Sequence, residues 1–217
     1  MLLVTGYLRV RMNDIERLRG PISRQVGAVR EFYGCEDYSF GIDLLEPDLL
    51  RVAERWRTRA AQAAHLIGDH MVEFNIAMRA ANVVATSVDS YEGGIVRRLL
   101  QIPATSFRPE REERELVMVM GTVKFASGEL DQILPEIKAQ VTATRAEDGC
   151  QLFAFSRDML GSDTLHIAER WRDRDALTAH FDAPHMTAFN AAISRAKPQS
   201  MLVKSYDTTG ERVLVER

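Results

Sequence analysis

The sequence predicts an α+β protein: two tandem ferredoxin-like domains, each with the element order βαββαβ, that form an intramolecular dimeric α+β barrel. Two observations carry this prediction. The second half of the chain repeats the first at a constant offset of 115 residues, the separation of Cys35 and Cys150, with no gap between Gly6 and Tyr91. Each copy also shows strand-like and helix-like patterns in the same order.

The repeat includes the residue types that are rare in this chain. The run from Ala53 to Arg57 returns as Ala168 to Arg172, which places both tryptophans, Trp56 and Trp171, at repeated positions. The repeated histidines are His65 with His180 and His70 with His185. A period of this length exceeds a solenoid unit, so each copy should fold as a domain. The predicted domains are residues 1–92 and 116–210, with a linker at 93–115 and a tail at 211–217.

The second copy illustrates the order of elements. Strands are expected at residues 119–125, 151–158, 165–171 and 201–206. Apolar residues at helical spacing between Leu130 and Val141 predict the first helix, which Pro135 should kink or divide, as Pro21 should in the first copy. The second helix begins near Asp175 and is interrupted around Pro184. This order folds as an antiparallel sheet with helices on one face.

Pairing of the copies follows from the uncovered sheet face. A four-stranded sheet with one bare apolar face needs a second layer, and the fused copy supplies it at high effective concentration. We therefore expect an internal pseudo-dimer, with a further homodimer left open. Pro103 and Pro109 suit an exposed linker between the two domains.

Composition narrows the class of protein. The chain has 28 basic and 31 acidic residues and a net charge of −3, which leaves no basic field for nucleic acid or an anionic membrane. No apolar run reaches about 18 residues, and Met1 leads straight into a strand-like run without a secretory signal. The two cysteines fall in separate copies, so we expect free thiols in a reducing, cytoplasmic setting.

The repeated histidines and tryptophans are the residues best suited to chemistry. Trp56 and Trp171 end the third strand on its helix-facing side, where an indole is either core or a flat wall for an aromatic ligand. In one continuous helix, His65 and His70 would lie about 140° apart, but a helix break could bring them together. Each histidine is then either a general base or a structural hydrogen-bonding group.

Other residue types give weaker indications. Phe74-Asn75 and Phe189-Asn190 fall on the apolar helical face, so each asparagine is either structural or presented to a ligand. Cys35 and Cys150 have no adjacent base in sequence and are not expected to act as nucleophiles. No clear third or fourth ligand accompanies the histidines, and no flavin, nicotinamide or nucleotide motif is present. The sequence therefore predicts neither a metal nor an organic cofactor.

The second copy carries a family resemblance. The runs Glu169-Arg170-Trp171, Ala176-Leu177-x-Ala179-His180 and Pro184-His185-Met186-x-Ala188-Phe189 resemble the signature of the antibiotic biosynthesis monooxygenase family. They are most similar to its quinol monooxygenase branch, as is the run from Glu147 to Phe153. Through the repeat the resemblance extends to the first copy, which departs by having Gly68-Asp69 where the second has Ala183-Pro184.

The resemblance implies a cleft between sheet and helices in each copy. Its lining residues would be Trp56, His65, His70, Phe74 and Asn75, and then Trp171, His180, His185, Phe189 and Asn190. Relatives oxidise quinols, anthrones or similar phenolics with O₂ and without metal or flavin. The resemblance thus implies an enzyme whose partners are a small aromatic molecule and O₂. A histidine would serve as base, the tryptophan as stacking wall and the asparagine as donor.

Two alternatives share this cleft. An isomerase or other proton-transfer enzyme would use the same histidines, with Arg51, Arg55 and Arg170 available to hold a phosphate. A non-catalytic module would bind a small ligand without turnover. Haem degraders of the family carry an axial histidine where this chain has Asn75 and Asn190, so the comparison disfavours haem.

Overall fold

The computed structural model describes residues 1–92, 95–102, 111–113, 116–207 and 210–216, with side chains for 1–92 and 116–207. The chain divides into two compact units. Unit 1 is formed mainly by Met1–Glu92 and Val96–Glu112, and unit 2 mainly by Glu113–Arg217. The two units correspond to the two predicted copies.

Unit 1 contains the expected βαββαβ order followed by additional strands. Its strands are β1 (Leu2–Arg9), β2 (Cys35–Asp43), β3 (Leu49–Trp56), β4 (Ala85–Glu92), β5 (Ile95–Ile102) and β6 (Arg111–Glu113). Its helices are α1 (Met12–Arg30), α2 (Arg59–Leu66) and α3 (Asp69–Ala80). The strand order is β2-β3-β1-β4-β5-β6, and β1 pairs antiparallel with both β3 and β4. The first four strands therefore have the ferredoxin-like arrangement.

Unit 2 repeats this arrangement. Its strands are β7 (Val117–Lys124), β8 (Cys150–Asp158), β9 (Thr164–Trp171), β10 (Ser200–Asp207) and β11 (Gly210–Glu216). Its helices are α4 (Glu129–Gln132), α5 (Leu134–Thr144), α6 (Arg174–Phe181) and α7 (Pro184–Ala196). The strand order is β11-β10-β7-β9-β8, with β7 antiparallel to β9 and β10. Both units thus confirm the predicted fold class, while the joining of the two sheets into one barrel stays a prediction.

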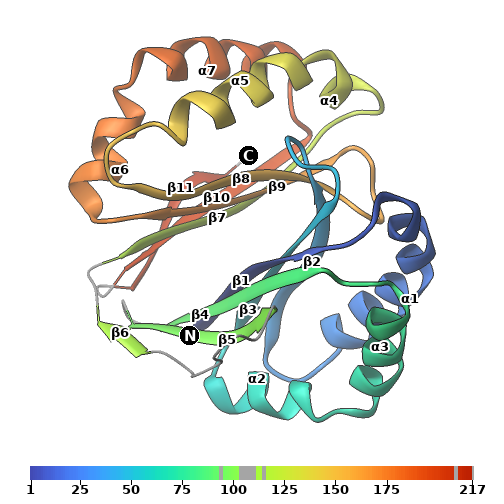
Figure 1. Cartoon of the computed structure of the whole chain (residues 1–217). Helices are drawn as coiled ribbons and strands as arrows, with labels where there is room; N and C mark the ends of the chain where they lie inside the picture. The colour runs from blue at the N-terminus through green and yellow to red at the C-terminus, as the bar shows by residue number, and fades with distance from the viewer. Residues whose placement is uncertain (93–94, 103–110, 114–115, 208–209, 217) are drawn as a thin grey trace. The chain divides into compact units, whose positions relative to one another are not determined.

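In each unit the helices cover one face of the sheet (Figure 1). The long helix α1 shows why, because its buried apolar residues recur at intervals of three and four. These residues are Ile15, Leu18, Ile22, Val26 and Val29. One apolar stripe therefore packs on the sheet while the opposite face meets water. The largest fully buried side chains, Trp56 and Trp171, lie at the ends of β3 and β9.

The two prolines act differently on the first helix of each unit. Pro135 follows a break at Ile133 and lies in the first turn of α5, so the helix is divided there as expected. Pro21 lies inside α1, which nevertheless runs without a break from Met12 to Arg30. A proline in the first turn of a helix lacks only an N–H that has no intrahelical partner, which is why the division at Pro135 costs little.

Glycine is required at the turn before the second strand of each unit. Gly34 and Gly149 have φ of +85° and +84°, which a residue with a Cβ adopts only with strain. A Cβ at these positions would lie 2.6 Å from the Cβ of Ala61 and 2.5 Å from that of Ala176. This repeated turn sets where the following cysteine and strand begin.

The segment predicted as a linker and the predicted tail both contain strands. Strand β5 neighbours β4, and β11 pairs antiparallel with β10 at the same offset in the repeat. Pro103 and Pro109 lie outside the described residues. The predicted domain boundaries omit these strands because each copy was expected to end at its fourth strand.

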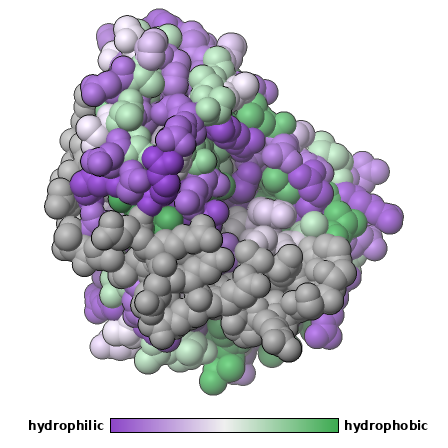
Figure 2. Space-filling view, turned by 60° about the vertical axis from the view of Figure 1, so that its left-hand side comes forward, coloured by the Kyte–Doolittle hydropathy of each residue, from purple (hydrophilic) through white to green (hydrophobic). Residues whose placement is uncertain are grey.

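The described surface in view in Figure 2 is mostly hydrophilic, with hydrophobic residues in smaller groups. No helix within the described ranges is both long and apolar enough to cross a membrane. Both cysteines are free thiols, as expected.

Candidate functional site

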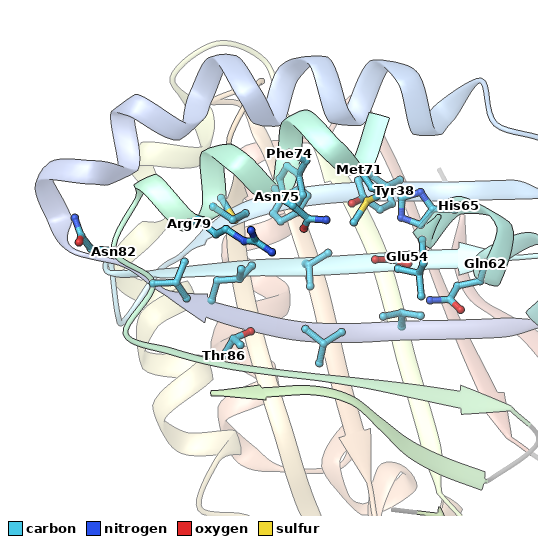
Figure 3. Close-up of a pocket in the computed structure, with 18 residues that line it drawn as sticks. Tyr38, Glu54, Gln62, His65, Met71, Phe74, Asn75, Arg79, Asn82 and Thr86 are labelled. Atoms are coloured by element: carbon cyan, nitrogen blue, oxygen red, sulfur yellow. The ribbon is translucent and has the colours of Figure 1, made fainter. Parts of the chain in front are cut away.

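A cavity of about 730 Å³ lies in unit 1 between the sheet and helices α2 and α3 (Figure 3). Its apolar lining is Val4, Leu8, Phe40, Val52, Leu66, Met71, Phe74, Met78, Val83 and Val88. Its polar lining is Tyr38, Glu54, Gln62, His65, Asn75, Arg79, Asn82 and Thr86. Small-molecule sites have this size, and they have mostly apolar walls with a few polar groups that orient the ligand.

Most polar side chains gather toward the two ends of the cavity, with Asn75 between them (Figure 3). Figure 3 shows Glu54, Gln62 and His65 at one end and Arg79, Asn82 and Thr86 at the other. Apolar side chains of the strands lie between them. A ligand that fills the cavity would therefore have an apolar body and polar groups at its ends.

Glu54 is the acid of this cavity. It lies between Val52 and Trp56 on the helix-facing side of β3, and only 6% of it is exposed. Burial raises the pKa of its carboxyl group to about 7, although the indole Nε1–H of Trp56 donates to its Oε2 at 2.8 Å and opposes that rise. Both protonation states are therefore populated near neutral pH, as a general acid or base requires.

His65 and His70 are brought together by the break between α2 and α3. The Nδ1 of His65 lies 2.7 Å from the Nε2 of His70, so the expected effect of a helix break is confirmed. Burial, with a smaller contribution from His70, lowers the pKa of His65 to about 4. His65 is therefore neutral at neutral pH and is a much weaker base than the neighbouring Glu54 carboxylate.

Gln62 presents an unused donor at the same end of the cavity. Its side chain is 4% exposed, and its Nε2 has no hydrogen-bond partner among the described residues. A buried donor without a partner costs about 1–3 kcal/mol. An acceptor on a ligand would remove this cost, so Gln62 points to a ligand with an oxygen at this end.

Trp56 packs against His65 without lining the cavity. It is fully buried and its ring stacks on that of His65, with 4.9 Å between centroids. It is not among the residues that line the cavity. Trp56 therefore positions His65 and Glu54, whereas the family resemblance implied that it would face a ligand.

Phe74 and Asn75 both line the cavity from α3, as the resemblance implied. Asn75 and its repeat equivalent Asn190 are exposed, however, so the prediction that these amides lie on an apolar helical face was wrong. They stand one residue beyond Phe74 and Phe189, where the face already turns toward solvent.

Unit 2 surrounds its histidines differently. Glu147 occupies the position of Phe32, and its Oε1 lies 2.8 Å from the Nδ1 of His180 and 2.9 Å from the Nε2 of His185. In unit 1 the Phe32 ring contacts the histidines edge-on, with its centroid 5.4 Å from that of His70. The same helix break thus brings a histidine pair together in both units, but only unit 2 adds a carboxylate to it among the described residues.

The tryptophan and glutamate of unit 2 repeat those of unit 1. Trp171 is fully buried and donates from Nε1 to Glu169 at 2.8 Å, and burial raises the pKa of Glu169 to about 7. Several polar cavity residues of unit 1 are replaced by apolar residues in unit 2. Leu177 stands for Gln62, Met201 for Thr86 and Phe153 for Tyr38. Phe189 stacks on Phe155 at 5.6 Å between centroids.

Two of the three arginines considered as a phosphate grip lie in unit 1, away from the cavity, and the third, Arg170, lies in unit 2. Arg51 pairs with Asp43 at 2.8 Å and Arg55 with Glu36 at 3.2 Å, and neither lines the cavity. The cation that lines the cavity is Arg79 of α3. The cysteines are also unsuited to nucleophilic roles, because burial raises the pKa of Cys35 and of Cys150 to about 11.

Three acidic residues of the sites were not among the residues predicted from the sequence. Glu54 and Glu169 stand within the repeated Ala-Glu-Arg-Trp-Arg run, two residues before each tryptophan. Strand alternation places a residue two positions away on the same buried face, so the signal was present. Glu147 gave no such signal, because its equivalent is Phe32 and only the folded loop brings it to the histidines.

Fold and cavity together define a tandem α+β protein with a ligand-sized space between the sheet and helices of unit 1. The chain belongs to the antibiotic biosynthesis monooxygenase family. The profile of that family, described as "Antibiotic biosynthesis monooxygenase", matches residues 1–76 and 116–192, which is more than half of the chain. There is one match in each unit, which confirms the resemblance.

Curated relatives match shorter stretches. The Mycobacterium tuberculosis protein named "Putative monooxygenase Rv0793" is 37% identical over 57 residues, which are 26% of this chain and 55% of that protein. An uncharacterized protein of Synechocystis is 26% identical over 73 residues, which are 34% of this chain and 50% of that protein. The chain thus spans about half the length of the curated relatives it matches.

The chain is also similar to several solved structures. That of a "putative monooxygenase" from Lactobacillus acidophilus covers 99% of both chains, with 15% identity and a TM-score of 0.42. That of the Mycobacterium tuberculosis protein covers 42% of this chain and 91% of its own, with 26% identity and a TM-score of 0.39. The family membership rests on the two profile matches.

Proposed function

We propose that unit 1 is a monooxygenase that oxidises a small phenolic or quinol-like aromatic molecule with O₂, without a metal or flavin. The observation that carries the proposal is a buried glutamate in the wall of an apolar cavity, where burial raises the pKa of its carboxyl group to about 7. Membership of the family and the names of the relatives support oxidation as the type of reaction. In this proposal Glu54 is the general base.

The cavity suits such a substrate. Its apolar walls would hold an aromatic ring and exclude water, while a phenolic hydroxyl at the end lined by Glu54 and Gln62 would meet these two side chains. The carboxylate would accept the hydroxyl proton, and the unpartnered Nε2 of Gln62 would donate to the oxygen as negative charge develops there. In a water-poor cavity both interactions are stronger than in solution.

The reaction needs only the substrate, O₂ and a base. Glu54 takes the phenolic proton, and the electron-rich phenolate passes one electron to O₂. The resulting radical pair joins through a new C–O bond at a ring carbon. Glu54 returns its proton to the peroxide, the O–O bond breaks, and water leaves with the hydrogen of that ring carbon. Phenol and O₂ thus become quinone and water, and one oxygen atom remains as a carbonyl.

His65 and His70 would act by positioning in this scheme. A neutral His65 does not compete with Glu54 for the substrate proton, and its contact with His70 fixes the orientation of its ring. The expectation that a histidine is the base is therefore replaced in this proposal by a carboxylate base beside a neutral imidazole.

Oxygen uptake by the purified chain tests the proposal. With a panel of phenols and hydroquinones, we expect uptake above the spontaneous rate, and we expect Glu54→Gln to lower it by about a hundredfold. Circular dichroism would verify that the variant is folded. Uptake at the spontaneous rate, or uptake unchanged in Glu54→Gln, would refute the proposal. Turnover in the absence of O₂ would instead favour an isomerase, and tryptophan quenching without turnover a binding module.

A further inference from the structure

The side chains of Glu147, His180 and His185 form a second cluster with chemical potential, and it lies in unit 2. One potential ligand atom from each residue lies within 4.8 Å of the other two. Glu147 precedes the left-handed turn at Gly149, His180 lies in the last turn of α6, and His185 lies in the first turn of α7. Three separate segments therefore direct a carboxylate and two imidazoles at one point.

We infer that Glu147, His180 and His185 form a binding site for a divalent transition-metal ion such as Zn²⁺. Two imidazoles and one carboxylate are a common zinc ligand set, with the remaining coordination position open to water. Ligand atoms around a tetrahedral zinc ion lie about 3.4 Å apart, so modest side-chain rotations suffice. No metal was expected from the sequence because a third ligand was not evident there, and the fold supplies Glu147.

Burial favours this site over an ordinary surface cluster. The side chain of His180 is 3% exposed, while those of Glu147 and His185 are 17% and 24% exposed. His180 thus forms the buried side of the site, while the partly exposed Glu147 and His185 leave the other side accessible to an ion. The ion would replace the hydrogen bond between His180 and Glu147 and the close contact between His185 and Glu147. Each imidazole nitrogen binds a metal through its lone pair, which a tautomer change frees.

The Thr144 hydroxyl is a further polar neighbour of the cluster. Its Oγ1 lies 3.3 Å from the Nε2 of His185 and also accepts from Gln140. It would hold the His185 ring in place in the free protein. Val29 stands at this position in unit 1 and Phe32 at that of Glu147, so the equivalent positions of unit 1 offer no comparable ligand set.

Zinc titration of the full chain, stripped with a chelator, tests this inference. We expect one zinc ion per chain, and thermal stability that rises with zinc concentration. Glu147→Gln keeps the size of the side chain and should weaken zinc binding by about tenfold or more. The matched variant His70→Ala, at the equivalent of His185, should leave the zinc stoichiometry at one.

Two results would overturn the inference. One is a wild-type chain that binds no zinc at about 10 µM free ion. The other is a folded Glu147→Gln chain that binds zinc as tightly as the wild type. Neither result bears on oxygen uptake by unit 1, because the proposed base of that reaction is Glu54.

Discussion

Units 1 and 2 share a backbone and a histidine spacing, but they surround the histidine pair with different chemistry. In unit 1, His65 and His70 contact each other directly beside the Phe32 ring. In unit 2, Glu147 stands where Phe32 does and contacts both imidazoles. A single position therefore decides whether the pair borders an apolar ring or joins an anionic cluster.

The spaces between sheet and helices differ in the same way. Unit 1 surrounds its cavity with polar groups such as Gln62 and Thr86, where unit 2 has Leu177 and Met201. The buried glutamate and its tryptophan donor are common to both units. The comparison teaches that a shared buried acid does not make two equal sites, because the lining around that acid has diverged.

The largest expected effect is on oxygen uptake, which should depend on the buried Glu54 and not on the buried Glu169. Glu54→Gln should lower oxygen uptake by about a hundredfold, since a general base contributes at least that much. Glu169→Gln should leave uptake within about twofold of the wild type. Oxygen-electrode rates on the best substrate of the panel provide the measurement. Equal losses in the two variants would show that both units work and would break the comparison.

The next largest effect is a loss of stability as pH rises, which Glu54 and Glu169 should both cause. Burial raises the pKa of Glu54 and of Glu169 from 4.5 to about 7. Between these values the unfolded glutamate is ionised while the folded one keeps its proton, so unfolding releases a proton and stability falls as pH rises. The loss is about 3 kcal/mol per group and is complete above pH 7.

Urea unfolding at about pH 5 and about pH 8 measures this loss. Glutamine does not titrate, so Glu54→Gln and Glu169→Gln should each reduce the difference in the free energy of unfolding between the two pH values. A variant with the full wild-type pH dependence would mean that its glutamate is ionised in the folded chain.

The third prediction is that one substitution can give the histidine pair of unit 1 the zinc binding proposed for unit 2. Phe32→Glu places a carboxylate beside His65 and His70, and we expect the zinc stoichiometry to rise from one to two per chain. The second site should bind at least about tenfold more tightly than the same position in the wild type. Zinc titration with Glu147→Gln as background isolates the new site. An unchanged stoichiometry would show that neighbours other than position 32 prevent binding in unit 1.

The smallest effect concerns what the units share. Gly34→Ala and Gly149→Ala should each lower the free energy of unfolding by about 1–2 kcal/mol, because both positions need positive φ and approach an alanine closely. Gly27→Ala is the control, since nothing lies within 4 Å of its Cβ position in α1. It should be neutral or slightly stabilising. Clearly unequal losses at Gly34 and Gly149 would show that the two turns are not equivalent.

The fold was largely predictable because the repeat reports each element twice. Strand and helix patterns in one copy checked those in the other, and the break near Pro184 placed His180 near His185. The domain ends were less predictable, because β5 and β11 follow the part of the repeat that carried identical residues. The prediction that Asn75 and Asn190 lie on the apolar helical face was wrong, because hydrophobic periodicity does not resolve where such a face ends.

The sites were only partly predictable. Histidine spacing indicated two pairs, but whether a carboxylate joins a pair depends on Glu147, which lies 33 residues from His180 in sequence. Strand alternation could have predicted that Glu54 and Glu169 are buried, but it could not have predicted their raised pKa. That shift arises from the loss of water around the carboxyl group, which requires the packed environment.

The sequence by itself determined the duplication, the βαββαβ order of each copy and the repeated histidine and tryptophan positions. These follow from local patterns and from identity between the copies. Only the tertiary structure decided that Trp56 supports His65 from behind, that Glu54 lines the cavity, and that Glu147 completes a cluster in unit 2. Such contacts depend on how distant segments pack together, and hydrophobic periodicity does not encode the distance between two side chains.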